Sequence, residues 1–119
     1  MNGLAALLIA WASLAGCASW AWASDTRALG VPRFGRGGAW ARAACLVILQ
    51  CALAVSVLGW AGGLALVGCA WMLLGGLYVA ALNGWPAATQ RWAWRTGWAA
   101  LALAACSVAM ERVIGEWRA

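Results

Sequence analysis

The chain has 119 residues, 66% of them hydrophobic and 9% charged, with a formal net charge of +5 at pH 7 that comes from eight Arg against three acidic residues. This composition leaves too little polar surface for a water-soluble domain of this size. The Arg residues lie beside apolar segments, where they act as topology signals, so we predict no nucleic-acid partner. We predict one membrane domain over residues 1–119.

The predicted elements are four transmembrane helices, which make the fold class an all-α integral membrane bundle. The first covers residues 3–23, a stretch without charge. The 48 residues between Arg42 and Arg91 also carry no charge, and because one crossing takes about 20 residues, this length predicts two helices. We place them at 43–60 and 63–82, with the fold-back at Gly59-Trp60-Ala61-Gly62-Gly63. The fourth helix, at 96–114, is the shortest between charges and gains length if Arg95 snorkels.

The Arg distribution predicts how these helices are oriented. The basic loop 24–42 carries four Arg and the loop 83–95 carries two, whereas the connection between the second and third helices carries none. Since Arg is retained in cytoplasmic loops, both basic loops should face the cytoplasm of a bacterial cell. The expected protein is a multi-pass protein of the inner membrane with its N terminus outside. We expect loop 24–42 to be irregular, because Gly and Pro interrupt it.

Tryptophan is unusually abundant, and its position supports the same boundaries. Nine of the eleven Trp residues fall at predicted helix ends, where the amphipathic indole prefers the headgroup level. These interfacial anchors are Trp20, Trp22, Trp40, Trp60, Trp85, Trp92, Trp94, Trp98 and Trp117. Trp11 and Trp71 fall at mid-depth, where we expect them to pack between helices.

Few polar residues are candidates for a site. Arg33 and Arg36 in the first loop either dock anionic lipid or an acidic partner, or only set the orientation of the chain. Gln50 is the best polar candidate inside the membrane, and we predict an interhelical hydrogen bond for it, with contact to a polar substrate as the alternative. Because no charged group lies within the first three helices, we predict no catalytic residue and no enzyme activity.

Metal and cofactor chemistry also lacks its usual residues. Histidine is absent, and the five Cys are scattered over the predicted helices without a CxxC pair. We therefore predict no metal site and no cofactor. The segment Leu14-Ala15-Gly16-Cys17 is similar to a bacterial lipobox, but Met1-Asn2-Gly3 lacks the positive charge of a signal peptide. We expect the first helix to be retained as a membrane anchor.

The order of these features resembles a family of small uncharacterised bacterial inner-membrane proteins. The matching features are an uncharged first helix, a short basic loop, an Arg-led second helix and a Trp-containing third helix that ends at Pro86. They extend from Leu4 to Pro86 and match best over residues 60–64 and 71–86. The family is often encoded beside TonB-dependent siderophore receptors and PepSY-type membrane proteins, so the resemblance implies a non-enzymatic accessory role in iron uptake. Asp25-Thr26-Arg27, where the family has Arg-His pairs, and the added fourth helix are departures.

Two other functions remain open. The Gly and Ala residues at helical spacing would suit a structural subunit that packs against a larger membrane complex. The length and helix number are also similar to those of small multidrug resistance transporters, but the first helix lacks the acidic residue that couples those proteins to protons. The expected partners are membrane lipid and either another membrane protein or a second copy of the chain.

Overall fold

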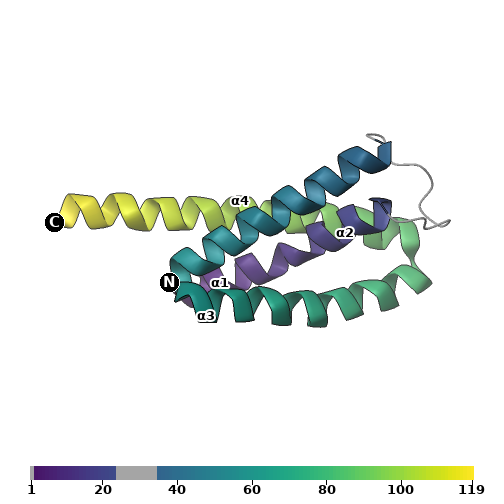
Figure 1. Cartoon of the computed structure of the whole chain (residues 1–119), viewed down its shortest axis with the longest axis horizontal. Coiled ribbons are helices and arrows are strands. Elements are labelled where there is room, and N and C mark those ends of the chain that lie inside the picture. Colours follow the sequence, from purple (N-terminus) through teal and green to yellow (C-terminus); the bar gives the residue numbers. More distant parts are fainter. Residues whose placement is uncertain (1, 24–34) are drawn as a thin grey trace.

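A computed structural model describes residues 2–23 and 35–119, and this part of the chain is almost entirely helical (Figure 1). Its helices are α1 (Asn2–Trp11), α2 (Ser13–Ala23), α3 (Gly35–Gly84) and α4 (Pro86–Arg118). Three stretches are long and apolar enough to cross a membrane, namely Gly3–Ala23, Gly37–Gly84 and Pro86–Arg118. The all-α class predicted from the sequence is confirmed.

Helix α3 is a hairpin of two arms. At Gly59 the backbone has φ 78° and ψ 177°, a conformation that residues with a side chain rarely adopt, and there the chain reverses direction (Figure 1). We call residues 35–58 the first arm and residues 60–84 the second arm. Gly63 lets the arms approach each other, since a Cβ at this position would lie closer than 3.0 Å to the backbone of Ala54 and Val55. The predicted five-residue fold-back thus occurs at its first residue.

Helices α1 and α2 form one interrupted arm at the centre of the bundle, which we call the central arm. The backbone hydrogen bonds change register at Ala12, where Ala12 N bonds to Leu8 O but Ala15 N bonds to Ala12 O. In the most apolar stretch of this arm 56% of the residues are buried, against 22% for α3 and 28% for α4. The central arm lies between the two arms of α3, with α4 alongside (Figure 1).

Helix α4 begins at Pro86, whose fixed φ suits the first position of a helix. Its buried residues recur every three or four positions and form one face, made of Gln90, Ala93, Gly97, Ala100, Leu101 and Ala104. Beyond Ala104 the helix leaves the bundle, and its C-terminal end projects past the turn of α3 (Figure 1). At about 1.5 Å per residue its 33 residues extend about 50 Å, almost the full 54 Å length of the molecule.

Two segments that we predicted as loops are helical instead. Residues 35–42 belong to α3, and residues 86–95 belong to α4, which begins ten positions before the predicted fourth helix. The prediction is wrong there because charged residues do not mark the ends of these helices. Ala, Arg and Gln are good helix formers, so a change in polarity need not end the helical backbone. The remainder of the first basic loop, residues 24–34, lies outside the described residues.

Candidate functional site

Gln50 is fully buried and makes hydrogen bonds to two other arms of the bundle. Its Nε2 donates to the Ile9 carbonyl and to Ser13 Oγ, both at 2.7 Å, and its Oε1 accepts from Trp71 Nε1 at 3.0 Å. The Ile9 carbonyl lies at the interruption between α1 and α2, where a side chain can enter the broken backbone ladder. We call Gln50, Ile9, Ser13 and Trp71 the Gln50 clamp. It joins the first arm of α3 to the central arm and to the second arm.

A second buried glutamine, Gln90 on α4, also makes hydrogen bonds to two other arms of the bundle. Its Nε2 donates to the Ala18 carbonyl at 2.8 Å, and its Oε1 accepts a hydrogen bond from the Tyr78 hydroxyl. Ala18 lies inside α2, and its carbonyl has a second lone pair for a donor outside the helix. We call Gln90, Tyr78 and Ala18 the Gln90 clamp. It joins α4 to the central arm and to the second arm of α3.

The two clamps repeat one arrangement on a shared helix face. Trp71 and Tyr78 are seven residues apart, two turns along the second arm, and each gives its ring donor to a glutamine Oε1. Each glutamine gives its Nε2 to a carbonyl of the central arm. Among the described residues the buried polar side chains are Ser13, Ser19, Gln50 and Gln90, and each one is hydrogen-bonded. Ser13, Gln50 and Gln90 therefore help to hold helices together, whereas Ser19 bonds to the Ala15 carbonyl of its own helix.

An apolar groove of about 420 Å³ opens between the central arm, the second arm of α3 and α4. We call it the Trp85 groove, and it is lined by Trp11, Leu14, Leu74, Leu77, Tyr78, Ala81, Trp85, Ala88, Thr89, Trp92, Ala93 and Thr96. Tyr78 of the Gln90 clamp thus forms part of its wall. Trp11, which we expected to pack between helices, also lines the groove.

A second hollow of about 410 Å³ adjoins the Trp85 groove on α4. The two share Ala88, Trp92 and Thr96, and the second adds Arg91 and Arg95. The Thr96 hydroxyl donates to the Trp92 carbonyl at 2.7 Å, so it is bound to its own helix. An apolar channel and a pair of cations therefore lie next to each other, and we call the second hollow the Arg91 hollow.

Three of the predicted Trp anchors gather beside an Arg. The rings of Trp22 and Trp94 lie 5.1 Å apart and those of Trp94 and Trp98 lie 5.6 Å apart, both edge to face. The Arg42 guanidinium carbon lies 5.6 Å from the centre of the Trp94 ring. Trp98 Nε1 is buried and finds no hydrogen-bond partner within the part of the chain that the structure describes. This Trp cluster joins α2, α3 and α4. Its member Trp98 also packs against the core residues Ala12, Ala15, Leu46 and Leu101, so it lies inside the bundle and not at its end.

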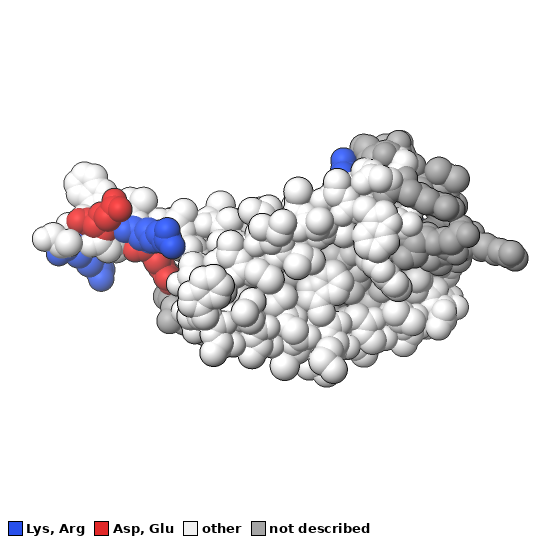
Figure 2. All heavy atoms as spheres, viewed as in Figure 1, with Lys and Arg blue, Asp and Glu red and all other residues white. Residues whose placement is uncertain are grey.

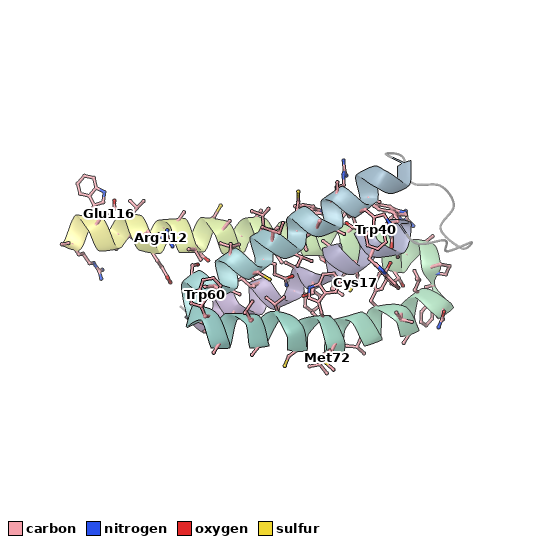
Figure 3. All side chains as sticks on the ribbon, in the orientation of Figure 1. Cys17, Trp40, Trp60, Met72, Arg112 and Glu116 are labelled. Atoms are coloured by element: carbon pink, nitrogen blue, oxygen red, sulfur yellow. The ribbon has the colours of Figure 1, made fainter. Side chains whose placement is uncertain are left out.

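The charged side chains lie toward the ends of the molecule. On the face in Figure 2, acidic and basic atoms gather at the projecting end of α4, and one further basic group lies near the other end. Figure 3 places Arg112 and Glu116 on that projecting end, with Trp40 near the start of the first arm of α3 and Trp60 at the turn between the two arms. The long surface between them carries apolar side chains such as Met72, which points outward.

The structure describes some of the residues predicted as sites from the sequence and not others. Arg33 and the side chain of Arg36 lie outside the described residues. Gly16 and Cys17 are buried within α2, where a Cβ on Gly16 would collide with the Trp71 ring. The structure places Gln50, our interhelical candidate, in the Gln50 clamp. Within the described residues no group of three or more Cys, Asp or Glu is placed to hold a metal ion.

The sequence did not predict the Gln90 clamp or the Trp85 groove. Gln90 fell in the predicted loop 83–95, and the groove depends on how three arms pack. A signal for Gln90 was present, because Ala93, Gly97 and Ala100 follow it at helical spacing.

Comparison with models of protein families, with curated proteins and with solved structures finds no match to this chain. The resemblance to the small inner-membrane family therefore stays a prediction from the sequence.

Proposed function

We propose that the protein is a four-span integral membrane protein that acts as a non-enzymatic accessory or structural subunit. The four spans are the central arm, the two arms of α3, and α4. The observation that carries the proposed role is that three of the four buried polar side chains of the described chain, Ser13, Gln50 and Gln90, make hydrogen bonds between arms of the bundle. The fourth, Ser19, bonds within α2 to the Ala15 carbonyl. A coupled transporter needs a titratable group free in its path, so this arrangement favours a structural role.

The level at which the arms pack supports α4 as a full span. Ala104 packs in one cluster with Ile9, Ala54 and Val67. Leu58, the last residue of the first arm, lies four residues beyond Ala54, and Val108 lies four beyond Ala104, so both are about 6 Å farther along their helices. Residues 111–118 then extend past the turn of α3 and out of the hydrocarbon. Arg42, Arg91 and Arg95 lie toward the opposite end, which the positive-inside rule assigns to the cytoplasm of a bacterial inner membrane.

Labelling of single cysteines tests this topology. In a variant without the five native Cys, we expect cysteines at positions 61 and 119 to react with an impermeant reagent from the periplasm, and a cysteine at position 87 to react only after the inner membrane is opened. A cysteine at position 52, in the lipid-facing part of the first arm, serves as an unreactive control. Labelling of position 87 from the periplasm would contradict the orientation. If position 119 reacted only after the inner membrane was opened, α4 would not be a fourth span.

For the cellular role, siderophore-linked iron uptake is the most specific form of the accessory hypothesis, and it rests on the family resemblance. The test is co-purification from native membranes of cells grown with little or ample iron, followed by mass spectrometry. Recovery with a PepSY-type protein or a siderophore transporter under iron limitation would support it. A stable partner unrelated to iron would favour the structural subunit, and self-association without a partner would favour the small transporter.

A further inference from the structure

We propose that the Trp85 groove and the Arg91 hollow together bind one anionic phospholipid, with an acyl chain in the groove and the phosphate beside Arg91 and Arg95. The inference rests on the proposed four-span placement. This pair differs from Arg33 and Arg36, the lipid candidates predicted from the sequence.

The dimensions of the groove suit an acyl chain. Along the second arm of α3 its walls run from Leu74 to Trp85, eleven residues or about 16 Å. Arg91 and Arg95 lie between Ala88 and Thr96 of α4, which line the groove as well, so the phosphate would lie at the side of the groove and not above its Trp85 end. The volume of about 420 Å³ falls in the usual range of roughly 300–1,000 Å³ for small-ligand sites.

The charge in the hollow suits a phosphate. Arg91 and Arg95 are four residues apart, so they share one face of α4, where like charges repel each other. The carboxylates within the described residues, Glu111 and Glu116, lie 16 and 21 residues beyond Arg95, which is about 24 Å or more. An anion between the two guanidinium groups relieves this repulsion, and guanidinium matches phosphate geometry with paired hydrogen bonds.

The walls favour a lipid over a helix of another protein. Transmembrane helices approach each other at small residues, which let the backbones come close. The Trp85 groove has small residues at Ala81, Ala88 and Ala93, but large side chains stand beside them: three Trp and three Leu, namely Trp11, Trp85, Trp92, Leu14, Leu74 and Leu77. These large side chains keep the backbone of another helix at a distance, whereas a flexible acyl chain can follow the spaces between them.

Native mass spectrometry of the delipidated protein in mild detergent tests the headgroup. The probes are phosphatidylglycerol and phosphatidylethanolamine with identical acyl chains. We expect tighter binding of phosphatidylglycerol, and a loss of about tenfold in its affinity for the variant R91Q/R95Q. The matched control R112Q/R118Q removes the same charge from the projecting end of α4 and should bind as the wild type does. Equal binding of the two lipids by the wild type, or equal losses in both double variants, would overturn the proposal.

A neighbouring pair of alanines tests the groove without changing charge. Ala88 lines both the Trp85 groove and the Arg91 hollow, whereas Ala87 is exposed and lines neither. We expect Ala88→Leu to weaken phosphatidylglycerol binding severalfold and Ala87→Leu to leave it unchanged. If Ala88→Leu instead released a co-purified membrane protein while lipid binding stayed intact, the groove would belong to a partner helix. Lipid binding is measured in detergent, so an unexpected labelling pattern would overturn the topology alone.

Discussion

The Gln50 clamp and the Gln90 clamp use the same chemistry in different backbone settings. Both glutamines accept from a ring donor on the second arm of α3 and donate to a carbonyl of the central arm. Gln50, however, meets the interruption between α1 and α2, where it also binds Ser13 Oγ. Gln90 meets the Ala18 carbonyl inside α2.

Because of this difference, the two clamps have different structural roles. The Ile9 carbonyl depends on a side chain because the backbone ladder is broken beside it, so the Gln50 clamp repairs the central arm as well as attaching it. Ala18 lies within a continuous helix, so the Gln90 clamp mainly attaches α4. The Gln90 clamp also touches the proposed lipid site through Tyr78. We therefore expect the first clamp to matter more for stability and the second to matter more for binding.

The largest expected effect comes from separating α4 from the central arm. A Cβ at Gly97 would collide with the Ala15 backbone, whereas a Cβ at Gly76 would meet no atom within 4 Å. We expect Gly97→Val to lower the unfolding free energy in mixed detergent micelles by about 3 kcal/mol. It should break the Gln90 clamp and spare the Gln50 clamp. A loss of similar size in the control Gly76→Val would show that the close approach at Gly97 is not the cause.

Removal of Gln50 should have the next largest effect. Gln50→Leu leaves the Ile9 carbonyl, the Ser13 hydroxyl and the Trp71 N–H without their partner in the bundle interior. Since each hydrogen bond between membrane helices contributes about 0.6 kcal/mol on average and up to about 1.7, we expect a loss of about 2 kcal/mol. The control Ser56→Ala removes only a bond within one helix, to the Leu53 carbonyl, and should change the unfolding free energy little. A loss no larger than that control would refute the repair role.

Removal of Gln90 should cost less stability but more binding. Gln90→Leu ends one bond to a helical carbonyl and one from Tyr78, so we expect a loss of about 1 kcal/mol in unfolding free energy. Because Tyr78 lines the Trp85 groove, phosphatidylglycerol affinity should fall, whereas Gln50→Leu should leave that affinity unchanged at temperatures where it is folded. If Gln90→Leu and Gln50→Leu had equal effects on the unfolding free energy and on phosphatidylglycerol affinity, the two clamps would not differ in role.

The sequence predicted the arms better than it predicted their contacts. Charge and hydropathy located the apolar segments, and Gly59 fell at the first residue of the proposed fold-back. The same reasoning placed Gln50 among helices, because a lone amide in an apolar segment needs a partner. It failed at residues 86–95, where Arg91 and Arg95 suggested a loop although the local residues favour a helix.

The hydrogen-bond partners of each polar group could not be predicted from the sequence, because they depend on how distant segments of the chain pack. The approach of Gly97 to Ala15 sets the distance between α4 and the central arm, and thereby brings Gln90 to the Ala18 carbonyl. No Pro lies near the interruption at Ala12, and Gly16, four residues on, did not predict its position. The Gln50 side chain that bonds to the Ile9 carbonyl there comes from 41 residues away in the chain. Helical spacing identifies faces, but the rotation of each helix about its axis comes from these contacts.

The smallest effect compares two Trp residues that differ in one hydrogen bond. Trp71 Nε1 donates to Gln50 Oε1, whereas Trp98 Nε1 is buried with no partner among the described residues. Both substitutions to Phe remove a ring and an N–H, but Trp71→Phe strands the Gln50 oxygen and Trp98→Phe removes a donor that had nothing to bind. We expect Trp71→Phe to lower the unfolding free energy by about 1 kcal/mol more than Trp98→Phe does. The double variant Trp71→Phe/Gln50→Leu should cost less than the sum of its parts, because one removal already ends the shared bond. Additive losses would show that Trp71 stabilises the bundle by packing alone. The hydrogen bond from Trp71 Nε1 to Gln50 Oε1 would then contribute no measurable stability.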